Sequence, residues 1–196
     1  MRIGKISAVG ALVVLGVSAG TVTKAEAAYI VTLQQDGSNV VATGSGSIDL
    51  TGLTYSITDS TSPFLHPSSA IIAVGATVST VADAYSGAFG PSTFGPGGYS
   101  GPSSGSGSLV ELSGASGFIF VPTGYTSGAS LGTSTDAWDN ATFASLGLTP
   151  GSYTWHWAGG AGSFTVDVIP EPASITLMVT GLVGLGLKRR RRRKTA

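Results

Sequence analysis

Cysteine is missing from all 196 residues, and lysine and arginine are missing from the whole middle of the chain. Without cysteine there is no disulfide, no thiolate metal site and no thiol nucleophile, so packing must stabilise any folded body. The ten basic residues lie only at 2–24 and 188–194. Between Ala28 and Ile169 there are eight acidic residues and no lysine or arginine, a formal charge of −8.

This charge distribution counts against several classes of function. Nucleic acids are bound mainly by cationic side chains that release counterions from phosphates, so we expect no nucleic-acid partner. The same absence removes the cationic clamps that hold phosphoryl groups and carboxylates, which argues against kinase-like chemistry. A divalent cation remains compatible with such an acidic body.

The beginning of the chain has the layout of a secretory signal peptide. Arg2 and Lys5 precede the apolar run 6–19, and Ala25 and Ala27 provide small residues at the −3 and −1 positions of a cleavage after Ala27. The alternative is an uncleaved membrane helix, but the apolar run is short for a hydrocarbon core of about 30 Å. We expect export machinery and a signal peptidase to process residues 1–27.

The other end joins an apolar run to a basic cluster. Residues 173–187 carry no charge, and as a helix they would cover roughly 22 Å, less than an average bilayer core. They predict a short transmembrane helix, and the basic cluster that follows would stay in the cytoplasm and leave the body outside. The cluster consists of Lys188, Arg189, Arg190, Arg191, Arg192, Arg193 and Lys194.

Pro170, Glu171 and Pro172 stand directly before this apolar run. Prolines cannot continue a helix inward, and they bias their neighbours toward an extended backbone. A protease could therefore reach the peptide between the folded body and the membrane. For the apolar run alone, a plain C-terminal membrane anchor is the alternative.

The order of Pro170-Glu171-Pro172, a short apolar helix containing Gly181, Gly184 and Gly186, and a terminal arginine cluster resembles the PEP-CTERM sorting signal of Gram-negative bacteria. The resemblance covers residues 169–196. It implies that exosortase, a membrane transpeptidase-like enzyme, recognises and cleaves the tail of an inner-membrane-anchored precursor. The body would then pass to the cell surface or the extracellular matrix.

Weaker similarities to proteins with this tail occur in the body, at residues 29–46 and 146–157. Such bodies generally have no established activity, so the resemblance implies an address and no chemistry.

The body, residues 28–168, predicts an all-β fold. Short segments rich in β-branched residues are separated by turn signals, such as 36–39 between the first two. With one helical turn around 140–146, about eight to ten short strands predict a β-sandwich or jelly-roll. The expected strands are 29–33, 40–43, 47–50, 53–58, 70–74, 108–112, 117–121, 153–157 and 163–168.

Residues 86–108 differ from the rest of the body, because 18 of the 23 are glycine, serine or proline. This composition predicts a long loop or a flexible insertion. Phe89, Phe94 and Tyr99 recur within it at every fifth position. They form either an exposed surface for sugars or other chains, or a set of rings that pack against the sandwich.

The body contains few residues that predict catalysis. His66 and His156 lie far apart in the sequence, and His156 should face away from Trp155 and Trp157 on its strand. No serine sits in a nucleophile elbow followed by a helix, and no pair of carboxylates has a short, recognisable spacing that suggests a glycosidase. We expect no catalytic residue and no enzyme activity.

Asp136, Asp139 and Asn140 lie within five residues and could supply hard oxygen ligands to Ca²⁺. Their spacing is not that of an EF-hand, and Asp139 or Asn140 also fits the N-cap of the short helix that follows. Ca²⁺ is therefore a low-specificity candidate, and no other cofactor is expected.

Trp138, Trp155 and Trp157 either form an aromatic platform for carbohydrate or fill the core. The sequence as a whole favours an exported, non-enzymatic surface or extracellular-matrix protein, with exopolysaccharide as a candidate partner. The alternative is a carbohydrate-binding module, or with less support a hydrolase, delivered by the same tail.

Overall fold

The computed structural model describes residues 27–157 and 162–170. The predicted transmembrane run 173–187 and the basic cluster 188–194 lie outside the described residues. So do Ala25, Glu171 and Pro172.

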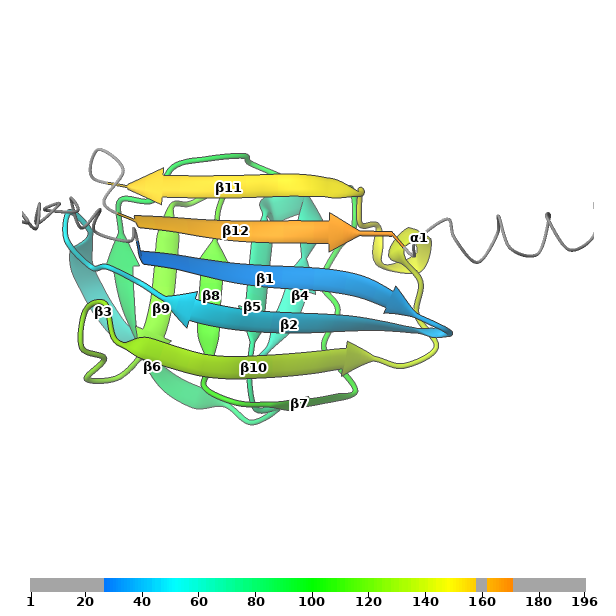
Figure 1. Cartoon of the computed structure of the whole chain (residues 1–196), viewed down its shortest axis with the longest axis horizontal. Helices are drawn as coiled ribbons and strands as arrows, with labels where there is room; N and C mark the ends of the chain where they lie inside the picture. The colour runs from blue at the N-terminus through cyan, green and yellow to red at the C-terminus, as the bar shows by residue number, and fades with distance from the viewer. Residues whose placement is uncertain (1–26, 158–161, 171–196) are drawn as a thin grey trace, which may run out of the picture.

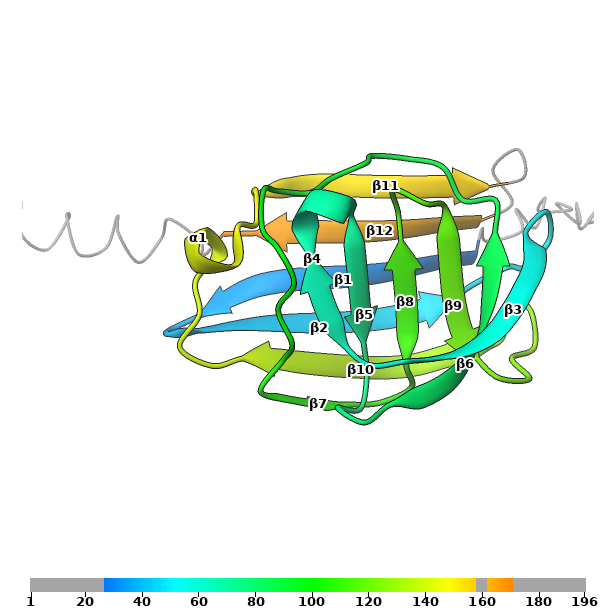
Figure 2. The same ribbon diagram turned by 180° about the vertical axis from the view of Figure 1, so that it is seen from behind.

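The described residues form two six-stranded sheets that face each other, with the strands of one crossing those of the other (Figures 1 and 2). Sheet A has the strand order β11-β12-β1-β2-β10-β7, and sheet B has the order β3-β6-β9-β8-β5-β4. Sheet A contains β1 (Ala27–Asp36), β2 (Asn39–Ser47), β7 (Ser104–Ser106), β10 (Ser130–Trp138), β11 (Gly151–Trp157) and β12 (Gly162–Ile169). Sheet B contains β3 (Thr54–Thr61), β4 (Phe64–His66), β5 (Ile71–Val74), β6 (Thr80–Ser86), β8 (Val110–Ser113) and β9 (Phe118–Pro122).

The predicted all-β fold is confirmed, with twelve strands in the described part instead of eight to ten. The strands without a counterpart in the prediction are β4, β6, β7 and β10. The predicted strand at 47–50 is wrong, because β2 ends at Ser47 and the next three residues cross from sheet A to sheet B. Side chains provide hydrogen-bond partners for the backbone of this crossing segment. The Tyr125 hydroxyl accepts from the Ile48 N–H (3.0 Å), and the Trp157 indole donates to the Asp49 carbonyl (2.7 Å).

The first two strands form the predicted hairpin. Asp36 pairs with Asn39 across a two-residue loop, and Gly37 takes a φ of 58°, which glycine adopts without steric cost. On its other side β1 pairs in parallel with β12, from Ala27 beside Gly162 onward. The first and the last strand of the body are therefore neighbours in the middle of sheet A.

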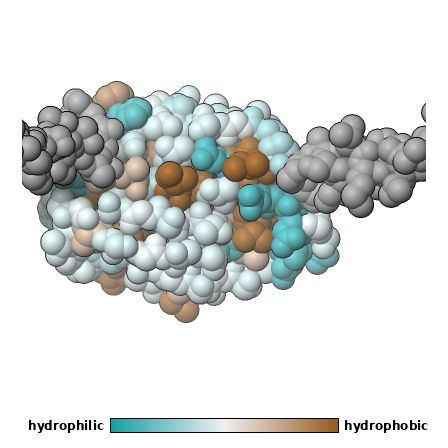
Figure 3. Space-filling model, in the orientation of Figure 1, coloured by the Kyte–Doolittle hydropathy of each residue, from teal (hydrophilic) through white to brown (hydrophobic). Residues whose placement is uncertain are grey.

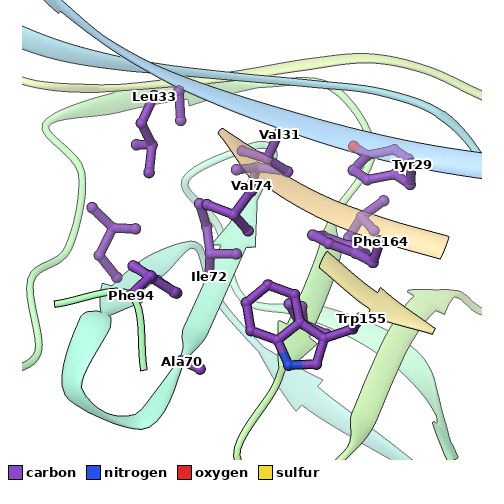
Figure 4. Packing of buried hydrophobic residues seen from close by; sticks show 14 of the residues in the cluster. Tyr29, Val31, Leu33, Ala70, Ile72, Val74, Phe94, Trp155 and Phe164 are labelled. Atoms are coloured by element: carbon purple, nitrogen blue, oxygen red, sulfur yellow. The ribbon is translucent and has the colours of Figure 1, made fainter. Parts of the chain in front are cut away.

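The core lies between the sheets, where alternate residues of each strand point inward. β1 contributes Tyr29, Val31 and Leu33, and Figure 4 shows Tyr29 beside Phe164 and Val31 beside Val74 of sheet B. Trp155 and Trp157 are completely buried and Trp138 nearly so. The core alternative for the three tryptophans is confirmed, and they do not form an exposed platform.

The glycine- and serine-rich segment is a long loop that runs along the side of the sandwich (Figure 2). We call residues 87–103 the strap. At its start, Phe89 and His156 of β11 exchange two backbone hydrogen bonds (2.9 and 3.0 Å). Near its end, Ser100 and Leu65 of β4 exchange two more, both 2.8 Å. The strap therefore joins an edge of sheet A to an edge of sheet B.

The three regularly spaced rings of the strap have different environments. Phe94 is completely buried in the core, held by a hydrogen bond from its N–H to the Pro67 carbonyl (3.1 Å). Phe89 and Tyr99 are 62% and 70% exposed. Neither alternative for the three rings holds as a whole, because one packs inside and two remain at the surface.

Candidate functional site

The junction between the body and the tail lies at the last two residues of β12, Val168 and Ile169. Val168 is 2% exposed and pairs with Gly151, whereas Ile169 is 42% exposed and pairs with Gln34 of β1. Pro170 follows directly, and it cannot donate a hydrogen bond to a ladder. The tail therefore begins where sheet A ends, with no spacer between them.

At the start of β1, Ala27 pairs with Gly162 and Ala28 with Ser163. The predicted cleavage after Ala27 would leave a strand that still begins one residue before the buried Tyr29. Signal-peptide cleavage at this bond stays a prediction.

The outer face of sheet B carries large apolar side chains, a feature that sequence reasoning missed. Cross-strand partners share a face, and one row of partners runs Phe64, Ala73, Glu111, Phe120 and Ala84 across the sheet. These positions alternate with the core residues of the same strands, so they point away from the core. The two phenylalanines are half-buried and the two alanines completely buried.

A second row on the same face runs His66, Ile71, Ser113 and Phe118. Tyr99 of the strap stacks on the Phe64 ring, with centroids 5.2 Å apart and planes at 25°. We call the surface formed by these two rows and Tyr99 the aromatic face. One signal was available in the sequence, because residues 118–121 are apolar at every position and such runs indicate strands that bury both faces.

Glu111 lies in the middle of the aromatic face and is 5% exposed. Its Oε2 accepts a hydrogen bond from the Thr61 hydroxyl (2.6 Å). Burial raises the pKa of this carboxyl, and the bond from Thr61 opposes the rise. The described residues contain no lysine or arginine, so no fixed cation offsets this group.

Asp136 is a second buried carboxyl, on β10 at the boundary between the sheets. Its Oδ2 accepts a hydrogen bond from the N–H of Gly75 (2.7 Å), just after β5, while Oδ1 has no hydrogen-bond partner. Burial raises the pKa of Asp136 to about 7, and the Gly75 N–H opposes the rise. The group links the two sheets and is neutral over much of the acidic range.

Tyr29 lies near this carboxyl inside the sandwich. Burial raises the pKa of its hydroxyl to about 12, the Ser134 hydroxyl opposes the rise, and the charge of Asp136 adds to it. Ser134 itself donates to the Ser108 carbonyl (2.6 Å). The tyrosine hydroxyl meets no partner with hydrogen-bond geometry. These groups form an internal polar cluster with a structural role.

The three candidate Ca²⁺ ligands do not share one environment. Asp136 is 1% exposed and faces inward, whereas Asp139 and Asn140 are exposed beyond the end of β10. No group of three or more histidine, cysteine or carboxylate side chains that could hold a metal occurs within 27–157 and 162–170. Ca²⁺ binding by these residues stays a prediction without a preformed cluster.

The predicted N-cap of the short helix is wrong. Helix α1 (Phe143–Leu146) is capped by Thr142, whose hydroxyl accepts from the Ser145 N–H (3.1 Å), while the Ser145 hydroxyl accepts from the Thr142 N–H (2.8 Å). This reciprocal pair is a capping box with serine at its third position. The helix starts later than expected, so Asp139 and Asn140 lie before the cap.

The predicted orientation of His156 on its strand is confirmed. His156 is exposed and faces opposite to the buried Trp155 and Trp157. The outer face of sheet A, on which it lies, is mostly of intermediate hydropathy with a few separate apolar spots (Figure 3). Among the residues that the structure describes, none belongs to a helix long and apolar enough to span a bilayer.

A family model of the PEP-CTERM protein-sorting motif matches residues 168–193, and the first two of these residues are the last two of β12. The chain is therefore a PEP-CTERM domain-containing protein. It is sorted toward the cell surface through processing by an exosortase-type membrane enzyme. No curated protein and no solved structure matches the chain.

Proposed function

We propose that the chain is a non-enzymatic surface or extracellular-matrix protein of a Gram-negative bacterium. It is made as an inner-membrane-anchored precursor and cut near Pro170-Glu171-Pro172. The observation that carries the proposal is the junction itself. The sorting motif begins as β12 ends, so a cut within the motif releases the β-sandwich without removing any strand.

The charge of the released body supports a passive role outside the cell. A cut near the motif removes the basic cluster 188–194, and signal cleavage removes the other three cations. The remaining body has a formal charge of −8 and no lysine or arginine to attract phosphates or carboxylates. Its three buried carboxyls, Asp49, Glu111 and Asp136, are all engaged in hydrogen bonds within the fold.

Intact-mass measurement of the mature protein tests this proposal. The full chain is expressed in one host that contains exosortase and in an otherwise identical host that lacks it. We expect a product that begins at Ala28 and ends near 170–172 in the first host, and a product that retains residues 188–194 in the second. A mature chain that keeps its arginines in both hosts would overturn the processing step.

A tail deletion tests the sorting step separately. We expect a chain that lacks residues 170–196 to be exported and folded but not passed on by the exosortase route. Since β12 ends at Ile169, this deletion leaves both sheets intact. If the shortened protein reaches the surface in the same amount as the intact one, the tail is not the sorting signal.

The aromatic face favours carbohydrate binding as a second candidate function. Phenylalanine and tyrosine rings offer flat apolar surfaces against which sugar rings can pack. Phe64 and Phe120 are separated by three strand spacings, or about 14 Å, on one face. Because the body has no cation, the ligand chemistry it fits is a neutral polysaccharide and not an acidic one.

A glycan array probed with the released body tests this second function. We expect binding of neutral glycans that the Phe118→Ser and Phe120→Ser variants lose. Ile30→Ser is the matched control, because Ile30 is an exposed apolar residue on the outer face of sheet A. Equal binding by all variants, or none by the parent protein, would remove the carbohydrate proposal.

A further inference from the structure

Two β-sheets present four edge strands, and three of them are short or covered. The strap covers β4 through the paired bonds between Leu65 and Ser100, and it covers part of β11 through those between Phe89 and His156. Strand β7 has only three residues. The fourth edge, β3, has eight residues.

Strand β3 is open to solvent along almost its whole length. Seven of its eight residues are exposed, including Tyr55 at 54% and Ile57 at 55%. Its backbone pairs with β6 on one side. Within the described residues no other strand or loop makes a backbone hydrogen bond to it.

The direction of the unpaired backbone groups follows from one side-chain contact. The N–H of Ser60 donates to Oδ1 of Asp59 (2.7 Å), so it points away from β6. Groups on one side of an antiparallel strand recur at every second residue. The N–H of Thr58 therefore also points to the open side, and unlike that of Ser60 it has no side-chain acceptor among the described residues. This edge thus offers backbone donors and acceptors that β6 does not use.

Edge strands of soluble proteins are usually protected by lysine, by proline or by a covering segment. Strand β3 contains no lysine and no proline, because the body has no cation to place there. Its protection is a register shift between Tyr55 and Ile57 and the carboxylate of Asp59. Neither the register shift nor the Asp59 carboxylate prevents the stretch from Ile57 to Thr61 from pairing with a strand of another molecule.

We propose that the open edge of β3 is a docking site for a second copy of this chain, joined by antiparallel strand pairing. Backbone donors and acceptors that β6 does not use are complementary to another strand edge, and a second copy supplies an edge of the same length, with the Ser60 N–H exchanging its Asp59 partner for a backbone carbonyl. Pairing about Thr58 places Thr58 opposite its own counterpart. It places Asp59 opposite Ile57 and so keeps the two Asp59 carboxylates from facing each other.

The charge of the two copies opposes this contact and gives it a recognisable salt dependence. Each body has a formal charge of −8, and Asp59 and Asp83 lie on the paired strands β3 and β6. Repulsion between copies is screened as the Debye length falls from about 30 Å at 0.01 M salt to about 8 Å at 0.15 M. Pairing should therefore strengthen with salt, because backbone hydrogen bonds and apolar contact are not weakened in the same way.

The absence of cysteine allows a direct test with a single engineered thiol. The full chain carrying Thr58→Cys is expressed in bacteria, and their membranes are exposed to a mild oxidant. Paired strands bring the two residues within the separation that a disulfide needs. We expect a disulfide-linked dimer on a non-reducing gel, with mass spectrometry showing two copies of this chain, and more of it at 0.15 M salt than at 0.01 M.

The matched control is Thr43→Cys, an exposed threonine on β2, whose two edges are both paired within sheet A. We expect no dimer from it. An equal dimer yield from both variants would show random collision and overturn the proposal. A Thr58→Cys chain that stays monomeric, or that links to a different protein, would also overturn it.

Two further variants separate pairing from folding. Ser60→Pro, added to Thr58→Cys, removes an N–H that β6 does not use, so the ladder with β6 should persist while the dimer is lost. Ser60→Glu leaves the backbone unchanged, adds a negative charge to the edge and should also reduce the dimer. Circular dichroism of both variants should match that of the parent. A dimer that survives in both folded variants would exclude this edge as the contact.

Discussion

The two outer faces of the sandwich have opposite chemistry, although both belong to one exported body. On sheet A the rows of outward residues are mostly threonine and serine, such as Thr32, Thr43 and Thr135 in one cross-strand row. On sheet B the corresponding positions include Phe64, Phe120 and Ile57. A polar outer face is sufficient for an antiparallel sheet with one buried side. The exposed parts of these apolar residues are therefore the surface that we propose for contacts with other molecules.

The comparison also separates stability from interaction. Sheet A holds Trp155, Trp157 and the linking carboxyl Asp136 on its inner side, together with the junction to the tail. Sheet B contributes the aromatic face and the open edge of β3. Substitutions inside sheet A should thus change the free energy of unfolding, whereas substitutions on the outside of sheet B should change binding.

The largest effect is expected from Trp155→Ala. Its ring is completely buried, and its indole N–H donates to the Pro91 carbonyl in the strap (3.0 Å). Removing a buried tryptophan costs about 3–5 kcal/mol of unfolding free energy through lost burial and the cavity left behind. Urea denaturation of the released body measures the change. A loss below about 1 kcal/mol would mean that this part of the core repacks easily.

Gly105→Ala should have the next largest effect. A Cβ at Gly105 would collide with Oδ1 of Asp136 and with the Gly75 carbonyl. Overpacking of this kind costs about 1–3 kcal/mol. Gly98→Ala is the matched control, because a Cβ there meets nothing within 4 Å. Thermal unfolding should separate the two variants, and equal melting temperatures would show that the sheets move apart freely at this boundary.

Asp136→Asn should change how stability depends on pH. The folded pKa of Asp136, about 7, lies above the ordinary value of 3.8. The contribution of protonated Asp136 to the free energy of unfolding is therefore complete below pH 3.8, and it is lost as the pH rises through about 7. The slope in this window is about 1.4 kcal/mol per pH unit.

Asparagine does not titrate, so the free energy of unfolding of the variant should lack this slope. Relative to the wild type, the variant should therefore become more stable as the pH rises to 8. Glu111 also has a raised pKa and remains in both proteins, so the difference between them isolates Asp136. Denaturation midpoints at several pH values provide the measurement. Parallel pH profiles for the two proteins would show that Asp136 is ionised in the fold.

The smallest effect on stability is expected from Phe120→Thr, on the aromatic face. Phe120 is half-buried and lies outside the main core, so its replacement should cost about 1 kcal/mol or less. The same denaturation series with Thr32→Ala on sheet A gives the comparison. A loss as large as that of Trp155→Ala would show that sheet B has a second core on its outer side, which would break the distinction between the two faces.

Local patterns predicted much of the body from the sequence. The Asp36–Asn39 hairpin, the alternation that buries Trp155 and Trp157, and the part of the predicted loop 86–108 that forms the strap all depend on neighbours in the chain. Strands β7 and β10 escaped prediction because serine, glycine and threonine predominate in them. They become strands through pairing with each other and with β2.

The candidate sites were predicted unevenly for the same reason. Pro170, Glu171 and Pro172 form a contiguous motif, so the sorting signal was visible without a fold. The aromatic face requires the register that places Phe64 in one row with Phe120, residues 56 positions apart in the chain. The open edge of β3 requires knowledge of which edges the strap covers. Neither long-range fact is encoded in a local pattern.

The parallel pairing of β1 with β12 also imposes an order of events on export. The strand of the body that is synthesised first has as its neighbour the strand that is synthesised last, whose final two residues already belong to the matched sorting motif. Contacts this distant in sequence form slowly, because a long segment of chain must be ordered to close them. The body can therefore complete sheet A only after β12 is available, and in the export route proposed above the sandwich would mature as its processing site is presented.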